Sequence, residues 1–181
     1  MNITNMLLAH KRNVDKDGFS IQWVNFNNDR TMLPFAYTVG LAKHGYPDMY
    51  IAGDIACETI KYILKGLFNK WQESGLYFGE AKGLLKNDLG LMMLPILEAS
   101  RLYVSINKVY YKAFPEHNKV KAELPTLVQV LWPDTNGAYP TEARYNKNCI
   151  QPVFCNQVEA PEIYQPAFPN QQNVTMLANA C

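Results

Sequence analysis

The sequence predicts an α+β fold, with a mostly antiparallel sheet of about five or six strands and two helices packed on it. Short runs rich in aromatic and β-branched residues are separated by turn residues, which is typical of strands. One longer stretch has the periodicity of an amphipathic helix. The predicted helices and strands do not alternate regularly, and this disfavours a doubly wound parallel sheet.

The first part of the chain predicts three strands in an antiparallel meander. Residues 19–26 partly alternate between apolar and polar types and stop at the polar cluster 27–30. Two further strands are expected at residues 35–41 and 49–52, joined by a short segment that contains Gly45, Pro47 and Asp48.

The clearest helix is expected at residues 55–71. Its apolar residues recur at spacings of three and four: Cys57, Ile60, Ile63, Leu64, Leu67, Phe68 and Trp71. Asp54 stands just before this stretch as an N-cap candidate. We expect the apolar face to be part of the core.

The second half of the chain predicts further strands around an ambiguous region. Residues 75–86 suit a loop around a short strand, and 89–97 suit a buried strand that Pro95 and Glu98 end. Residues 100–114 fit a strand or a helix, and a helix is favoured for their second half. Residues 126–132 predict a strand, followed by a turn at 133–137.

Length and composition favour one folded domain at residues 1–155, followed by a Pro/Asn-rich C-terminal tail at 156–181. The 17 Lys and Arg against 16 Asp and Glu leave a net charge of +1, so nucleic acid is not expected as a partner. A signal peptide and a membrane-length apolar run are both lacking, which predicts a cytoplasmic protein without membrane contact.

The cysteine and histidine pattern predicts neither a disulfide scaffold nor a metal site. The four cysteines form no CxxC pair, and Cys57 is expected to be buried in the helix and unreactive. The histidines, His10, His44 and His117, lie far apart in the sequence and show no metal-ligand spacing. No cofactor can be named from the sequence.

The first segment with residues suited to chemistry spans 34–48. Tyr37 and Thr38 interrupt an otherwise apolar strand, and His44 and Asp48 lie on the turn that follows. Histidine is readily poised for proton transfer near neutral pH, and a nearby carboxylate could orient it. The alternative is that Tyr37 packs, Thr38 bonds a neighbour and His44 is an exposed loop residue.

The second segment spans 131–145. Trp132 could stack on a flat ligand, while Asp134 and Arg144 could orient it through charged hydrogen bonds. A turn alone accounts for Pro133, Asp134 and Gly137, but it does not account for Trp132 or Arg144.

Three strings together resemble a family of bacterial and phage proteins, domain of unknown function 4262. They are PFAYTVGL at residues 34–41, HGYPD at 44–48 and LVQVLWPDTNGAYP at 127–140. The resemblance covers about residues 18–145. It marks the same two segments and implies no activity, cofactor or catalytic role.

Three functions follow as hypotheses. The first is binding of a small polar, nucleotide-like ligand in a pocket formed by segments 34–48 and 131–145, with these ligand-binding residues: Phe35, Tyr37, Thr38, His44, Trp132, Asp134 and Arg144. The second is a hydrolase or transferase with His44 as acid or base, oriented by Asp48 or Asp134. The third is a phage or mobile-element protein that acts by protein contact, and a homo-oligomer remains open. A flavin-binding split barrel is a further alternative that rests on the fold class alone.

Overall fold

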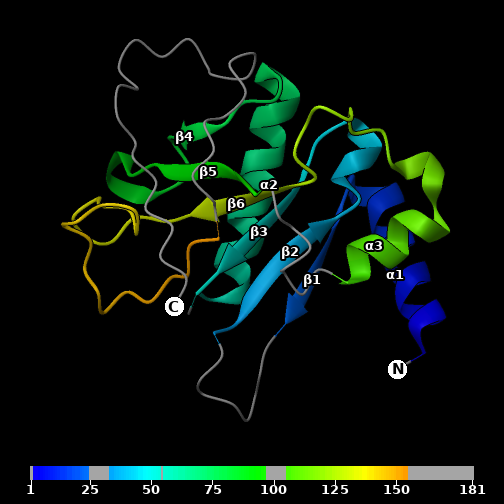
Figure 1. The fold of residues 1–181 in the computed structure, drawn as a ribbon, viewed down its shortest axis with the longest axis horizontal. Helices are drawn as coiled ribbons and strands as arrows, with labels where there is room; N and C mark the ends of the chain where they lie inside the picture. Colours follow the sequence, from blue (N-terminus) through cyan, green and yellow to red (C-terminus); the bar gives the residue numbers. More distant parts are fainter. Residues whose placement is uncertain (1, 25–32, 54, 97–104, 155–181) are drawn as a thin grey trace.

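The computed structural model describes residues 2–24, 33–53, 55–96 and 105–154, which form three α-helices and six strands (Figure 1). The helices are α1 (Ile3–Asp17), α2 (Cys57–Ser74) and α3 (Ser105–Ala113). The strands are β1 (Ser20–Val24), β2 (Phe35–Val39), β3 (Asp48–Ala52), β4 (Gly79–Ala81), β5 (Leu91–Ile96) and β6 (Leu127–Leu131). This arrangement confirms the predicted α+β class.

The strands form one mixed sheet in the order β1-β2-β3-β6-β5-β4. The predicted meander is confirmed, because β1, β2 and β3 are antiparallel neighbours. β3 and β6 pair in parallel, with Asp48 opposite Leu127, and the remaining neighbours are antiparallel. The first residues of the two central strands, β3 and β6, therefore lie side by side at the same end of these strands.

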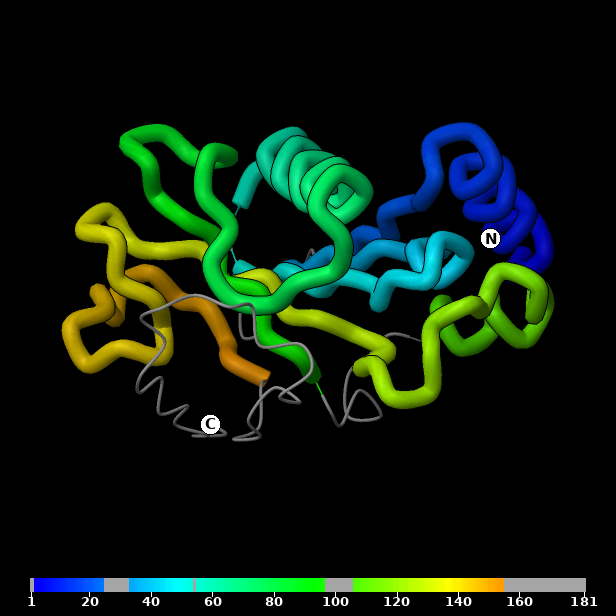
Figure 2. Tube along the Cα trace, turned by 90° about the horizontal axis from the view of Figure 1, so that it is seen from above, coloured from blue at the N-terminus to red at the C-terminus, as the bar shows by residue number. Residues whose placement is uncertain are grey.

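α2 covers one face of the sheet (Figure 2). The predicted apolar stripe is buried as expected from Ile60 to Trp71, and it packs on sheet residues that include Met49, Ile51 and Val128. Trp71 is fully buried and its indole N–H donates to the Tyr77 carbonyl oxygen at 3.1 Å. This cluster is the larger part of the core.

The other face packs on α1 and α3. Leu7 and Val14 of α1 and Tyr110 of α3 are buried in one cluster with Phe35 and Tyr37 of β2. β2, β3 and β6 are consequently buried along their whole length. Figure 2 shows α3 on the side of the sheet opposite α2, with α1 near the edge of the sheet that β1 forms.

The sequence predicts two helices, which correspond to α2 and α3. It does not predict α1. Asn2 caps α1 by accepting from the Thr4 backbone N–H at 3.0 Å, and Gly18 ends it in the left-handed conformation. Buried positions are sparse on α1, namely Leu7, His10 and Val14. Its sequence is therefore mostly polar, which hides the helical period.

Three local expectations need correction. Cys57 is exposed, because it is the first residue of α2 and precedes the buried stripe. The N-cap of α2 is Ala56, while Asp54 lies outside the described residues. Pro95 does not end its strand, since β4 pairs only with residues 91–93 of β5, and Pro95 removes no hydrogen bond from that ladder.

None of the helices that the structure describes is long and apolar enough to cross a membrane. The predicted tail at 156–181, together with Cys155 and Cys181, lies outside the described residues.

Candidate functional site

The two segments singled out by the sequence lie at opposite ends of the central strands. Asp48 begins β3 beside the start of β6, whereas Trp132 follows the end of β6. They also belong to different faces, because Trp132 packs on the α2 side and Phe35 and Tyr37 pack on the α3 side. The structure therefore does not bring the seven predicted ligand-binding residues together.

Asp48 is the centre of a buried hydrogen-bond network. Its carboxylate accepts from the Thr38 hydroxyl at 2.9 Å, the Leu41 backbone N–H at 3.2 Å and the Asn107 side-chain amide at 2.9 Å. The Tyr111 hydroxyl is a fourth donor. Four donors on one carboxylate tie β2, β3 and α3 to the loop at 40–47.

The network continues into the loop backbone. The Tyr111 hydroxyl accepts from the backbone N–H groups of Gly40 at 2.9 Å and Ala42 at 3.4 Å. Burial raises the pKa of Asp48 to about 7, although the hydrogen bonds from Tyr111 and Thr38 oppose this rise. Asp48 is only 1% exposed. A ligand has no direct access to it, and its role is to position the loop.

The neighbouring Tyr37 is enclosed as well. Burial raises the pKa of Tyr37 to about 12, while a backbone hydrogen bond from Ile106 opposes this. Of the sequence-predicted residues, Tyr37, Thr38 and Asp48 thus lie close together.

His44 lies apart from this network. It is exposed, its Nε2 is 3.1 Å from the Gly18 carbonyl oxygen, and its ring centroid is 5.3 Å from that of Phe68. The described partners of Asp48 do not include His44. Asp48 is one of the two carboxylates that the enzyme hypothesis assigns to orient His44, and its described hydrogen bonds go to other groups.

Asp134 organises its own loop. Its carboxylate accepts backbone N–H groups from Asn136 at 2.8 Å, Ala138 at 2.9 Å and Asn146 at 2.8 Å. The Ala138 N–H contributes most to lowering the pKa of Asp134. The Gly137 N–H donates to the Asp134 carbonyl oxygen at 3.0 Å, so the predicted turn is present.

The other two members of this segment also bind protein groups. The Trp132 indole N–H donates to the Ala52 carbonyl oxygen at 3.2 Å. Arg144 is exposed and its Nε lies 2.8 Å from a Glu142 carboxylate oxygen. These contacts give the 132–146 loop a structural role.

Replacing Asp134 with Ala is expected to speed hydrogen exchange at the amides of Asn136, Ala138 and Asn146, because each loses its acceptor. In the wild type the same amides should exchange faster as pH falls through the lowered pKa of Asp134, after correction for intrinsic exchange rates. Asp134→Asn retains one acceptor oxygen and serves as the control. Unchanged exchange in the alanine variant would contradict the assignment.

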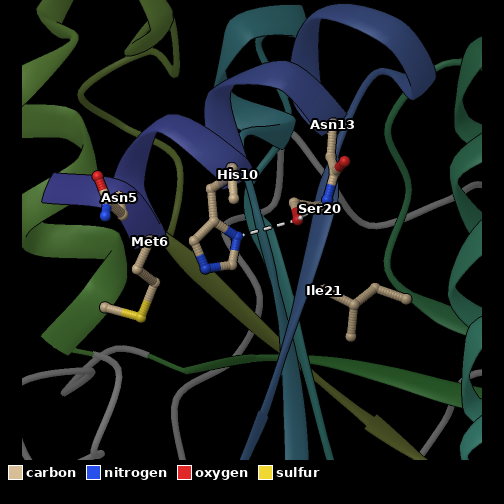
Figure 3. A pocket seen from close by; sticks show the side chains of 7 residues that line it. Asn5, Met6, His10, Asn13, Ser20 and Ile21 are labelled. Atoms are coloured by element: carbon tan, nitrogen blue, oxygen red, sulfur yellow. Dashed lines mark hydrogen bonds between the residues drawn. The ribbon is translucent and has the colours of Figure 1, made fainter. Parts of the chain in front are cut away.

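A pocket lies between α1 and β1, with a volume of about 230 Å³ (Figure 3). α1 contributes residues at helical spacing to it, and β1 contributes its first two residues; the lining residues are Asn5, Met6, Ala9, His10, Asn13, Ser20 and Ile21. His10 and Ser20 are buried, whereas Asn5, Ala9 and Asn13 are exposed. The pocket therefore opens to solvent and has His10 and Ser20 at its base.

The hydrogen bonds around His10 define its tautomer. The Gln22 amide nitrogen donates to the Trp23 carbonyl oxygen at 2.7 Å, which leaves Gln22 Oε1 at 3.1 Å from His10 Nε2. An amide oxygen can only accept, so His10 carries its proton on Nε2. His10 Nδ1 then has a free lone pair and accepts from the Ser20 hydroxyl at 2.9 Å (Figure 3).

Burial also affects the protonation of the His10 imidazole. It lowers the pKa of His10, although the hydrogen bond with Gln22 opposes the effect. The imidazole is therefore neutral at neutral pH. The Ser20 hydroxyl oxygen also accepts from the Asn13 side-chain amide at 3.1 Å. A neutral imidazole and a hydroxyl are thus held together at the base of a pocket.

Sequence reasoning missed these residues because it did not predict α1. If residues 3–17 are placed on a helix, Asn5, Ala9 and Asn13 lie on one face at a spacing of four. This spacing is the sequence signal that could have identified the pocket residues of α1. Gln22 joins His10 only through the docking of α1 beside β1. Among the described residues, no group of three or more His, Cys, Asp or Glu could hold a metal ion.

No curated protein and no solved structure matches the chain. The model of one family, Domain of unknown function (DUF4262), matches residues 13–146. The match contains the network of Asp48 and the pocket residues Asn13 and Ser20, and it begins just after His10. It spans most of the described chain and agrees with the resemblance found in the three sequence strings. The chain belongs to the family Domain of unknown function (DUF4262).

Proposed function

We propose that this protein binds a small, uncharged polar molecule in the pocket between α1 and β1. The observation that supports this most is the composition of the pocket. Polar groups from His10, Ser20, Asn5 and Asn13 meet apolar walls in one opening. Binding pockets commonly combine apolar walls with a few placed polar groups in this way.

The size and charge of the pocket restrict the ligand. Its volume of about 230 Å³ is below the roughly 300–1,000 Å³ typical of sites for drug-sized molecules. None of its lining residues is an Asp, Glu, Lys or Arg, and recognition of phosphate would call for Arg or Lys. The proposal therefore retains the small polar ligand of the sequence hypothesis and replaces the nucleotide-like one by a smaller, uncharged molecule.

The 34–48 segment supports this pocket by holding α1. Gly40 lies against Val14 of α1, and the Lys43 ammonium is 2.7 Å from the Asp15 carboxylate. The His44 ring reaches the Gly18 carbonyl oxygen at the end of α1. The Asp48 network fixes this loop, so the residues picked out in the sequence set the position of α1 beside β1.

The alternatives centred on His44 catalysis and on protein contact remain predictions, because the described contacts supply neither with a further observation.

A screen of uncharged fragments by ligand-observed NMR tests the proposal. We expect small alcohols, amides or esters to bind the wild type and to lose binding in Ala9→Trp, because an indole at this position occupies the pocket. Leu8→Trp is the matched control, since Leu8 is a neighbouring exposed residue of α1 that does not line the pocket. Equal binding to both variants, or no binding to the wild type, would contradict the proposal.

A further inference from the structure

We infer that Ser20 and His10 form a nucleophile–base pair that cleaves a small uncharged carboxylic ester, an inference that rests on the pocket of the proposed function. Ser20, His10 and Gln22 form a continuous chain, with 2.9 Å from the serine hydroxyl to Nδ1 and 3.1 Å from Nε2 to the amide oxygen. A nucleophile bonded to a base that a third group orients is the general signature of nucleophilic catalysis.

The tautomer suits the role of each group. Gln22 holds the proton of His10 on Nε2, and the amide of Gln22 is itself fixed by the Trp23 carbonyl oxygen. The lone pair on Nδ1 therefore faces the Ser20 hydroxyl, where a base must face the proton that it takes. Gln22 is a positioning residue, because it acts through His10.

Access and charge agree with this assignment. Ser20 and His10 both line the pocket, so an ester carbonyl bound there can approach the hydroxyl (Figure 3). The side-chain amide of Asn13 lies 3.1 Å from the Ser20 oxygen. This amide donates to the Ser20 oxygen and so helps to hold the hydroxyl beside His10 Nδ1, which accepts its proton.

The reaction balances with water as the second substrate. The Ser20 oxygen forms a bond to the ester carbonyl carbon while His10 Nδ1 takes the hydroxyl proton. The bond between that carbon and the alcohol oxygen then breaks, and His10 returns the proton to the leaving alcohol. Water next attacks the acyl-serine with His10 again as base, which releases the carboxylic acid and restores Ser20.

The pocket selects the acyl group. Met6 and Ala9 provide apolar walls, and a volume of about 230 Å³ admits a short chain. The lining holds no ammonium or guanidinium to pair with a negatively charged acyl group. Short-chain esters without charge are therefore the substrate class.

Reaction with a small alkyl fluorophosphonate tests the pair on the full chain. The serine oxygen displaces fluoride from phosphorus, and the adduct is located by peptide mass spectrometry. We expect a single adduct on Ser20 of the wild type and none in Ser20→Ala. Ser74→Ala is the matched control, because Ser74 is an exposed serine at the end of α2. An unmodified wild type, or an adduct on another residue, would overturn the inference.

The role of His10 is measured by the rate of the same reaction. His10→Gln should lower it by roughly a hundredfold, as loss of a general base does. Retention of the wild-type rate in His10→Gln would overturn the pair.

The pH dependence of p-nitrophenyl acetate hydrolysis tests whether Gln22 positions His10. If Gln22 had only a structural role, replacing it would not shift this pH dependence. In Gln22→Glu the new carboxylate should raise the pKa of His10, so the acid limb of the kcat/KM profile should shift to higher pH. An unshifted profile, or no hydrolysis above the Ser20→Ala background, would count against the inference. Fragment binding without a Ser20 adduct would overturn catalysis and leave the binding proposal intact, whereas absence of both would remove both.

Discussion

Replacing Asp48 with Ala is expected to lower the free energy of unfolding by about 3–5 kcal/mol. The change leaves the donors of Thr38, Leu41, Asn107 and Tyr111 without their shared acceptor in a site that is almost fully buried. A buried donor without a partner costs about 1–3 kcal/mol, and domains of this size are stable by only about 5–15 kcal/mol. Urea unfolding monitored by circular dichroism measures the loss.

Asp48→Asn separates charge from shape. It keeps one acceptor oxygen and the volume of the side chain, so its loss at neutral pH should be smaller than that of Asp48→Ala. A loss below about 1 kcal/mol in Asp48→Ala would contradict the role assigned to the network, because that is the value of a single ordinary hydrogen bond.

The pH dependence gives a second readout of the same group. The pKa of Asp48 is raised to about 7 in the folded state, above the ordinary value of 3.8. The folded state therefore binds more protons than the unfolded state between these values, and the contribution of Asp48 to stability declines as pH rises toward 7. Asp15 acts in the opposite direction, because its lysine partners lower its pKa to about 2. Relative to Asp48→Asn, the wild type should lose stability from pH 5 to pH 8.

Replacing Gly40 with Ala is expected to lower the free energy of unfolding by about 3 kcal/mol. A Cβ atom at Gly40 would lie 2.3 Å from one methyl carbon of Val14 and 2.8 Å from the other. The residue also has φ of 103°, a left-handed conformation that alanine adopts at a cost. Both effects arise where the loop meets α1, so the variant should displace the helix that lines the pocket.

A double-mutant cycle with Val14→Ala isolates the steric part. Val14→Ala removes both methyl groups that the new Cβ would meet, and the loss in the double variant should therefore be smaller than the sum of the two single losses. We expect a coupling free energy of about 1–2 kcal/mol from urea unfolding. Additive losses would show that the contact between Gly40 and Val14 does not position α1.

The sequence predicts those parts of the fold where one local pattern decides the structure. The apolar spacing from Ile60 to Trp71 identifies α2, because the helix buries a continuous stripe on the sheet. The run Leu127–Leu131 of β6 is apolar except at Gln129, and it likewise signals a strand that is buried on both faces. In α1 the buried positions Leu7 and Val14 are seven residues apart, and the polar residues between them obscure the period.

The candidate site could be predicted only in part, because its groups meet through tertiary contacts. Thr38 and Asp48 stand out in the sequence, but Asn107 and Tyr111 reach Asp48 from α3, which is distant in the sequence. The contact of His10 with Ser20 depends on how α1 turns back at Gly18 toward β1. The parallel pairing of β3 with β6 separates Asp48 from Trp132, and no local pattern specifies that pairing.

Chemical-shift mapping by ¹H–¹⁵N NMR tests most directly whether the pocket between α1 and β1 is the functional site. The protein would be titrated with the tightest uncharged fragment from the screen. We expect saturable shifts centred on the amides of residues 5–13 and 20–22, which border the pocket. Largest shifts at residues 40–48 or 132–146, or the absence of any fragment that gives saturable shifts, would contradict it.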